Sequence, residues 1–401
     1  MQAVLLCAGK SSRFFPFTAR HKSLFTVCGR PVLSYTLEAL VICGIRDLVV
    51  VVGPLESGKE ELIEYLNDGK TFGFETVHYV DEPEQAGMGR AVQVAAPYIH
   101  DSFLVINPYH ITIGSLLPLL TKQSNKYAGV VAMATTDHPE RYGMLDVDAQ
   151  NLVRHVVEKP LPVDAPSNKR LLGAYVLKET FLPYLDQFKP APDHFEKALS
   201  AYAQENSVLA LPYEQQMFTL KYPWHMFPIL HYLLDTKEHH INSSAKIAST
   251  AIIEGKVVID EGAVIYDYAV IKGPVYIGKN AKIGTHSLIR EYTCIEEGAS
   301  IGCFTEIRNS RIGQRTSIHS GFIGDSIIGN DLKIGAGFCT ANRRLDRGPI
   351  KVSIKNERID SEVTRLGVLA GDGSSIGINV STMPGAVISP QSIINAGSMV
   401  M

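Results

Sequence analysis

A six-residue repeat dominates the second half of the sequence. Neither an α-helix, with about 3.6 residues per turn, nor a flat strand, with a repeat of about two, has this period. It predicts the hexapeptide repeat of a parallel β-helix, in which three hexads form one triangular coil and each isoleucine stacks on that of the coil before. Small residues such as Gly278, Gly284 and Gly302 turn the corners. An isoleucine-rich β-sandwich is the alternative, but it does not explain an unbroken run. The repeated positions are Ile241, Ile247, Ile253, Ile259, Ile265, Ile271, Ile277, Ile283, Ile289, Ile295, Ile301 and Ile307.

Length and composition indicate two globular domains. A chain of 401 residues is long for one hydrophobic core, and we expect one domain over residues 1–235 and the β-helix over residues 236–401. Hydrophobic residues make up 45%, charged residues 20%, and the net charge is −3. Without a basic excess there is no electrostatic footprint for nucleic acid, so no nucleic-acid partner is expected.

The N-terminus and the cysteines favour a cytoplasmic protein. Residues 1–6 are apolar but lead into Cys7 without a basic leader or a cleavage site, which favours a buried first strand over a signal peptide. No run of about 18 apolar residues is present, so we expect no membrane span. The six cysteines show neither CxxC spacing nor the density of a disulfide scaffold, and we expect reduced thiols.

The first half alternates apolar strands with helices. Residues 2–8, apolar from Ala3 onward, and residues 48–52 are expected to form strands, with a helix between them over residues 31–43. Strand, loop, helix and strand in this order predict a doubly wound, Rossmann-like parallel sheet. Its ligands bind at the carboxyl ends of the strands, which directs attention to the loop over residues 9–22.

That loop carries a recognisable pattern. Residues 8–18 read Ala-Gly-Lys-Ser-Ser-Arg-Phe-Phe-Pro-Phe-Thr, and His21-Lys22 and Gly29-Arg30-Pro31 follow. The set resembles the nucleotide-binding signature of sugar-1-phosphate nucleotidyltransferases. Backbone amides near Gly9, with Arg13 and Lys22, can hold the phosphates of a nucleoside triphosphate. Taken alone, Arg13 or Lys22 would be interpreted as a solvated surface charge. The ordered pattern over residues 8–31 favours a phosphate-binding site instead.

Further segments are similar to this family in the expected order. The resemblance implies that Gln85 and Gly87 lie where the pyrimidine base is read, and that residues 142–145 form a strand beside the sugar site. It also implies that Glu158 contacts sugar hydroxyls and that Lys159 contacts a phosphate.

Other positions depart from the family pattern. The resemblance implies Mg²⁺ bound by two aspartates, but Tyr109 and Thr219 stand at the matching positions, and no acidic residue lies between Asp101 and Asp137. A tyrosine and a threonine do not supply the anionic oxygens that Mg²⁺ prefers. Leu171 stands where an asparagine holds the sugar, and Ser11 replaces a loop glycine. We therefore expect the usual metal site to be lost, and we assign no metal ligands.

The β-helix contains a second candidate site where the isoleucine spacing tightens to five. Residues 317–325, with His319, resemble the active-site coil of the acetyltransferase domain in bifunctional glucosamine-1-phosphate acetyltransferase/uridylyltransferases and their archaeal two-domain relatives. The resemblance implies that His319 is the general base that deprotonates the attacking amine, a task suited to imidazole. A lone histidine is more often a surface or satisfied core residue, but the surrounding motif favours catalysis.

The neighbouring residues complete this resemblance. It implies that Asn342 positions the substrate and that the phosphate is met by three basic residues, Arg290, Arg308 and Lys351. A basic pair on the wall could instead be solubilising charge. The departures are Phe322 for a tyrosine, Lys333 for an asparagine and Arg343 for a tyrosine. A charged excursion over residues 343–365 leaves the hexad pattern and is expected to form a loop.

Two functional hypotheses follow. In the first, the protein is a nucleotide-sugar pathway transferase that moves an acetyl group from acetyl-CoA to an amino-sugar 1-phosphate, with a first domain that binds nucleoside triphosphate or nucleotide sugar but turns over poorly. In the second, it is a non-catalytic nucleotide-sugar sensor or assembly paralogue. A still-active pyrophosphorylase is a further alternative. The resemblance also implies a homotrimer with a left-handed β-helix and acyl-CoA bound between protomers.

Overall fold

The computed structural model describes residues 1–55, 58–355 and 357–401. It divides into two compact units. The first consists of Met1–Lys10 and Val32–Thr219, and the second of Ser11–Pro31 and Leu220–Met401. The signature loop and residues 220–235 thus belong to the same unit as the β-helix, whereas the sequence led us to expect them in the first domain.

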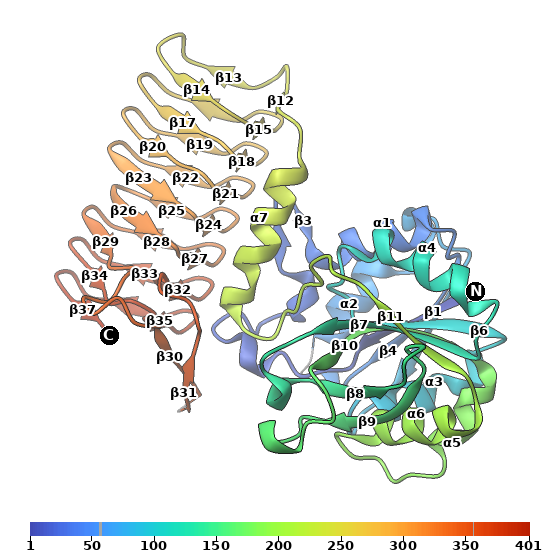
Figure 1. Ribbon diagram of the computed structural model, residues 1–401. Coiled ribbons are helices and arrows are strands. Elements are labelled where there is room, and N and C mark those ends of the chain that lie inside the picture. Colours follow the sequence, from blue (N-terminus) through green and yellow to red (C-terminus); the bar gives the residue numbers. More distant parts are fainter. Residues whose placement is uncertain (56–57, 356) are drawn as a thin grey trace. The chain divides into compact units, whose positions relative to one another are not determined.

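The first unit is built on a mixed sheet (Figure 1). In the described residues the main path is β11-β7-β10-β6-β1-β4-β5, with β8 and β9 paired beside β10. The pairings β6-β1-β4-β5 are parallel, as expected, but β10 runs antiparallel between β6 and β7. The strands are β1 (Gln2–Cys7), β4 (Asp47–Val52), β5 (Thr76–Asp81), β6 (Ser102–Ile106), β7 (Gly129–Thr135), β8 (Gly143–Val147), β9 (Val153–Glu158), β10 (Lys169–Lys178) and β11 (Val208–Pro212).

Helices cover this sheet because its central strands are apolar on both faces. Leu48 to Val52 are at most 1% exposed, which matches the continuous run of β-branched residues in β4. The expected helix over residues 31–43 is confirmed within one residue by α1. The helices are α1 (Val32–Ile42), α2 (Lys59–Leu66), α3 (Met88–Ala95), α4 (Ile113–Ser124), α5 (Leu182–Leu185) and α6 (His194–Glu205).

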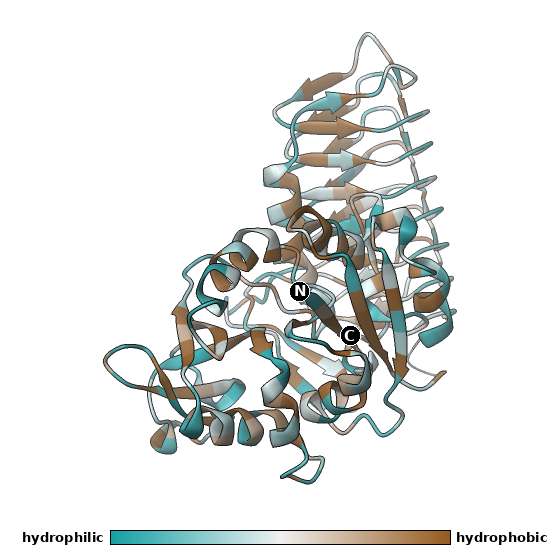
Figure 2. Ribbon diagram, turned by 90° about the vertical axis from the view of Figure 1, so that its right-hand side faces the viewer, coloured by the Kyte–Doolittle hydropathy of each residue, from teal (hydrophilic) through white to brown (hydrophobic). Residues whose placement is uncertain are grey.

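The second unit contains the β-helix predicted from the hexads, with the three-faced architecture of the left-handed hexapeptide type. The described residues form three parallel sheets of eight strands each, which we call the first, second and third faces. Hydrophobic colouring follows their strands (Figure 2). The first face has β12 (His240–Ile241), β15 (Val257–Ile259), β18 (Val275–Ile277), β21 (Thr293–Ile295), β24 (Arg311–Ile312), β27 (Ile327–Ile328), β32 (Leu369–Ala370) and β35 (Val387–Ile388).

The other two faces repeat this arrangement. The second has β13 (Lys246–Ile247), β16 (Val264–Ile265), β19 (Lys282–Ile283), β22 (Ser300–Ile301), β25 (Ser317–Ile318), β28 (Lys333–Ile334), β33 (Ser375–Ile376) and β36 (Ile393–Ile394). The third has β14 (Ile252–Glu254), β17 (Val270–Lys272), β20 (Leu288–Ile289), β23 (Thr305–Arg308), β26 (Gly321–Gly324), β29 (Phe338–Thr340), β34 (Ser381–Thr382) and β37 (Met399–Val400). From Ile259 onward the repeat isoleucines stack in register inside the coils and form one buried cluster, whereas Ile241 in the first coil is 38% exposed.

The shortened spacing after Ile307 contracts the coil without breaking the stack. Ile259 pairs with Ile277, a regular coil of 18 residues, whereas Ile307 pairs with Ile323, only 16 residues on. The excursion over residues 343–365 contains a hairpin of β30 (Lys351–Ile354) and β31 (Glu357–Asp360), so it is more ordered than the expected loop. The amide of Leu366 then donates to the carbonyl of Asn342 at 2.9 Å, which closes the excursion.

The second unit also contains the helix α7 (Met226–Thr236) and a short hairpin of β2 (Thr26–Val27) and β3 (Arg30–Pro31). Tyr292 donates from its hydroxyl to Asp235 at 3.2 Å, which ties the end of α7 to the coils. None of the helices in residues 1–55, 58–355 and 357–401 has the length and apolar character required to cross a membrane.

Candidate functional site

The signature loop, residues 11–31, has a compact core of its own. The rings of Phe14, Phe17 and Phe25 contact one another with centroids 5.2 to 6.0 Å apart. Ser11, which replaces a glycine of the family pattern, accepts a 3.0 Å hydrogen bond from the amide of Lys22 through its hydroxyl. The serine therefore fixes the backbone of a predicted phosphate ligand.

His21 is a buried, neutral part of this loop. Its Nδ1 lies 2.6 Å from the Ser23 hydroxyl, and burial, helped by the charge of Lys22, lowers its pKa to about 3. Arg13 is exposed on the same loop. The loop thus offers cations at its surface while its histidine stays uncharged at neutral pH.

The loop is anchored to the first face of the β-helix by a buried arginine. Arg311 is 2% exposed, its Nε donates to the carbonyl of Thr26 at 3.2 Å, and its guanidinium lies 4.5 Å over the ring of Phe25. The Nη1 group donates to the carbonyl of Ile328 at 2.9 Å and Nη2 to Asn330 at 3.1 Å. These contacts join a loop near the N-terminus to the wall of the β-helix.

A buried carboxylate continues the anchor. Glu296 lies 3.8 Å from Arg311, and its Oε2 accepts a 2.9 Å hydrogen bond from the amide of Gly29. The amide of Cys28 donates to the sulfur of Cys294 at 3.2 Å. Gly29 has φ +80°, and a Cβ there would lie 2.2 Å from the Tyr276 hydroxyl, so only glycine fits.

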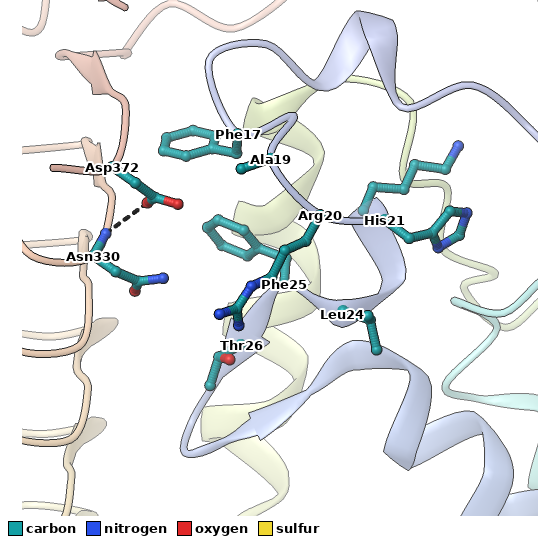
Figure 3. A pocket seen from close by; sticks show the side chains of 10 residues that line it. Phe17, Ala19, Arg20, His21, Leu24, Phe25, Thr26, Asn330 and Asp372 are labelled. Carbon is teal, nitrogen blue, oxygen red and sulfur yellow. Dashed lines mark hydrogen bonds between the residues drawn. The ribbon is translucent and has the colours of Figure 1, made fainter. Parts of the chain in front are cut away.

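A small cavity of about 30 Å³ separates the loop from the same wall (Figure 3). Phe17, Arg20 and Phe25 line the loop side, and Asn330 and Asp372 line the β-helix side, joined by a 2.7 Å hydrogen bond. The side chain of His21 points away from Asn330 and Asp372 (Figure 3). The cavity has room for about one water molecule.

Three predicted nucleotide-binding residues lie in the first unit around the end of β1. Gln85 donates from Nε2 to the carbonyl of Ala8 at 2.8 Å, which brings it next to Gly9. Gly87 directly precedes α3 and has φ +105°. A Cβ at Gly87 would lie 3.1 Å from the carbonyl of Ala191, which explains the need for glycine.

The predicted sugar contacts lie at the end of β9. Glu158 forms an ion pair with Lys159. A Cβ built on Gly143 would lie 3.1 Å from both Glu158 Oε2 and Leu171 Cδ1, and 3.7 Å from Glu196 Cγ. Glu196 is therefore a fourth member of this group, which sequence reasoning missed. An acidic residue in the first turn of a helix is common, so the sequence carried no signal for its burial.

The residues at the expected magnesium positions do not fit a magnesium site. Tyr109 is partly buried, and desolvation raises its pKa to about 12, so it is a neutral phenol. Thr112 donates to the carbonyl of Gln216 at 3.0 Å, which places the segments that carry Tyr109 and Thr219 beside each other. In residues 1–55, 58–355 and 357–401, no group of three or more His, Cys, Asp or Glu could hold a metal ion.

His319 lies at the corner between the second and third faces of the β-helix. The side chain is exposed, and its backbone amide donates to the carbonyl of Ile334 at 2.9 Å. A Cβ on Gly302, in the coil before, would lie 2.0 Å from the carbonyl oxygen of His319. A glycine at that corner is therefore required for the His319 coil to stack.

A buried aspartate organises two of the other predicted residues. Asp325 is 2% exposed; it accepts a hydrogen bond from Asn342 Nδ2 and lies 3.5 Å from Arg308 Nη2. Asn309 donates to the other carboxylate oxygen at 2.6 Å, and His231 of α7 bonds to Asn309 at 2.6 Å. Sequence reasoning assigned no role to Asp325, although it is the last residue of the motif over residues 317–325 that carries His319.

The remaining predicted phosphate ligands are less closely grouped. Arg290 is paired with Glu306 at 3.2 Å and Glu291 at 3.3 Å, so its charge is already compensated. Lys351 is exposed on β30. Among the described residues, no hydrogen bond or ion pair joins Lys351 or His319 to the Asp325 cluster. Phe322 lies close to the Asp325 cluster. A Cβ built on Gly324 would lie 2.9 Å from Phe322 Cζ and 2.8 Å from Asn342 Nδ2, so the two side chains flank the same point.

Fold and site together define a two-domain transferase, with a sugar-nucleotide type α/β unit and a hexapeptide-repeat β-helix. Residues 2–218 match the nucleotidyl transferase family model, and residues 256–291 match the bacterial transferase hexapeptide model of six repeats. The chain belongs to the family of bifunctional sugar-1-phosphate nucleotidylyltransferase/acetyltransferases.

Full-length relatives support this assignment. The protein named bifunctional protein GlmU of Methanococcus maripaludis strain C7 is 37% identical over 405 residues, covering 100% of this chain and 94% of the relative. Its namesake in Methanocaldococcus jannaschii is 32% identical over 406 residues, covering 100% and 95%. The bifunctional sugar-1-phosphate nucleotidylyltransferase/acetyltransferase of Sulfurisphaera tokodaii is 31% identical over 409 residues, covering 100% and 97%.

Proposed function

We propose that the β-helix transfers an acetyl group from acetyl-CoA to the amine of a hexosamine 1-phosphate. The observation that carries this proposal is the Asp325 cluster, which fixes Arg308 and Asn342 on the coils that also carry His319. A buried carboxylate that orients an amide and a guanidinium is typical of a preorganised binding site.

The chemistry follows from the residue types. His319 takes a proton from the amine as its nitrogen attacks the thioester carbonyl; the C–N bond forms, the C–S bond breaks, and the CoA thiolate leaves and receives that proton. Asn342 positions the acceptor sugar. Arg308, with Arg290 and Lys351, binds the phosphate through charge-assisted hydrogen bonds.

For the first domain we propose binding of a nucleoside triphosphate or nucleotide sugar with poor turnover. Gly9, Gln85 and Gly87 would contact the nucleotide, Arg13, Lys22 and Lys159 the phosphates, and Glu158 the sugar. Poor turnover follows from the neutral phenol of Tyr109 at a position where Mg²⁺ would need a carboxylate. The same observation favours a second candidate, a sensor or assembly subunit that binds a nucleotide sugar without converting it. We also propose a homotrimer, on the family resemblance alone.

Thiol release from acetyl-CoA tests the first proposal. We expect the protein to release free CoA thiol in the presence of glucosamine 1-phosphate, and His319→Ala to abolish the release. His286→Ala is the matched control, because His286 is another exposed corner histidine, stacked between Tyr268 and Phe304. No release, or release that persists in His319→Ala, would refute acetyl transfer by His319. The second candidate, a sensor or assembly subunit, would then be favoured.

A pyrophosphate assay tests the proposal for the first domain. With UTP or dTTP, Mg²⁺ and N-acetylglucosamine 1-phosphate, we expect only slow pyrophosphate release. Rapid release at ordinary Mg²⁺ concentrations would show that the protein is an active pyrophosphorylase and that Tyr109 and Thr219 do not prevent turnover.

A further inference from the structure

A buried carboxyl group and a partly exposed one lie near each other in the first unit, where the nucleotide-sugar resemblance implies only one. Glu196 follows the start of α6 and is 6% exposed. Its side chain reaches the group formed by Gly143, Glu158 and Leu171: a Cβ at Gly143 would lie 3.7 Å from Glu196 Cγ and 3.1 Å from Glu158 Oε2, and the charge of Glu158 acts on the Glu196 carboxyl. A second carboxyl therefore lies at the proposed sugar site.

The two carboxyl groups differ in how they are satisfied. Glu158 is 16% exposed at its side chain and is paired with Lys159. Glu196 Oε2 is buried, and no hydrogen-bond partner for it exists in the described residues. A buried polar oxygen without a partner destabilises a fold, so such groups are frequent at ligand sites, where the ligand supplies the missing bond.

The neighbouring leucine explains why a second polar group is needed here. Leu171 is 6% exposed and offers no hydrogen bond to a sugar hydroxyl, although it stands where the family pattern has an asparagine. An asparagine amide both donates and accepts, and a protonated carboxyl does the same. Glu196 can therefore provide, from α6, the donor that β10 lacks.

We propose that Glu196 is a further substrate-binding residue of the first domain, which donates a hydrogen bond from its protonated carboxyl to a hydroxyl of the sugar while Glu158 accepts one from the same sugar. This inference rests on the proposed binding of a nucleotide sugar. It makes recognition of the sugar, but not of the nucleotide, dependent on pH.

The electrostatic surroundings support the protonated form. Burial, and then the charge of Glu158, raise the pKa of Glu196 to about 8; Asp193 adds to the rise and Lys159 opposes it. The buried Tyr175 of β10 also lies in the field of both glutamates. Other titratable groups lie on elements packed against α6. Arg90 contacts Glu84 and Gln93, Tyr184 donates to Glu205, and Arg154 pairs with Asp148. His155 is exposed.

Calorimetric titration with UDP-N-acetylglucosamine and with UDP alone tests this proposal. The ratio of the two dissociation constants isolates the contribution of the sugar and cancels effects of pH on the nucleotide. We expect Glu196→Leu to weaken binding of the nucleotide sugar by about 10-fold or more, the equivalent of losing one buried hydrogen bond, with UDP binding unchanged. Glu205→Gln, at the exposed far end of α6, is the control and should behave as the native protein.

The pH profile distinguishes a binding role from a structural one. Between pH 6.5 and 9 we expect the native protein to lose its preference for the nucleotide sugar as Glu196 ionises, and Glu196→Gln to keep its preference, within about threefold, across this range. A native ratio that does not change with pH, or a Glu196→Leu variant with the native ratio, would overturn the inference. If the native protein binds neither ligand, the proposed function of the first domain is refuted instead.

Discussion

Replacing Arg311 with methionine should release the signature loop from the β-helix. The change keeps the apolar stem of a side chain that is 2% exposed but removes the guanidinium that bonds to the Thr26 carbonyl and lies over Phe25. These two are its direct contacts with the loop: the other Arg311 hydrogen bonds end on Ile328 and Asn330 of the β-helix itself, and the ion pair with Glu296 reaches the loop only through the Gly29 amide.

The size of the effect follows from those two contacts. A hydrogen bond from a charged donor is worth about 1.5–3 kcal/mol, and a cation–π contact about 0.5–2 kcal/mol. We expect the free energy of opening the loop to fall by about 2–4 kcal/mol, since such terms are not fully additive. At about 1.4 kcal/mol per factor of ten, the open population rises by about 30- to 700-fold.

Native-state proteolysis measures this population. Trypsin cleavage after Arg20, an exposed residue of the loop, should accelerate in proportion to the open fraction when reclosing is fast. Arg315→Met is the matched control, because Arg315 forms an exposed ion pair with Asp331 worth about 0–1 kcal/mol. A cleavage rate in Arg311→Met within about fivefold of the native rate would show that Arg311 does not hold the loop.

Three further predictions concern the β-helix site and the first unit. Asp325→Asn should lower kcat/KM for the amino-sugar 1-phosphate by about 10- to 100-fold in the thiol-release assay, since it removes the charge that orients Asn342 and Arg308; an unchanged value would contradict the positioning role. Phe322→Tyr should lower the KM for the sugar phosphate by up to about fivefold, with the KM for acetyl-CoA as the control, and a higher KM for the sugar phosphate would argue against the assumed pose. Burial lowers the pKa of His110 to about 3, so the unfolded chain binds more protons below pH 6.5 and stability falls as pH falls. In urea unfolding, the native protein should therefore lose about 1.5 kcal/mol relative to His110→Gln between pH 6.5 and pH 5, and parallel curves for the two proteins would count against the assignment.

The β-helix could be predicted because its signal is local and repeated. Each coil buries the same kind of side chain at the same step, so Ile241 to Ile307 specify the stack before any tertiary contact is known. The strand, loop and helix at the start of the chain could also be predicted, because their apolar periods are distinct. The antiparallel direction of β10 could not be predicted, because its apolar pattern is compatible with either direction.

The sites were harder to predict from the sequence, because the roles of their key residues depend on burial. Asp325 and Glu196 look like ordinary acidic residues in the sequence, and only the fold excludes water from them. The anchor of the signature loop joins Arg311 to Thr26, 285 residues apart, and no period or motif reports a contact of that separation. Sequence similarity supplied the families of both domains but not these contacts.

The position of the loop's partners along the chain has a consequence for biosynthesis. Residues 11–31 leave the ribosome well before the surface that covers Phe17 and Phe25, which includes Arg311, Asn330 and Asp372. At about 5–20 residues per second, that surface follows after a delay on the order of tens of seconds. During this interval the aromatic face of the loop is uncovered, so a segment made later completes a loop made much earlier, and a chain truncated before the β-helix would never bury it.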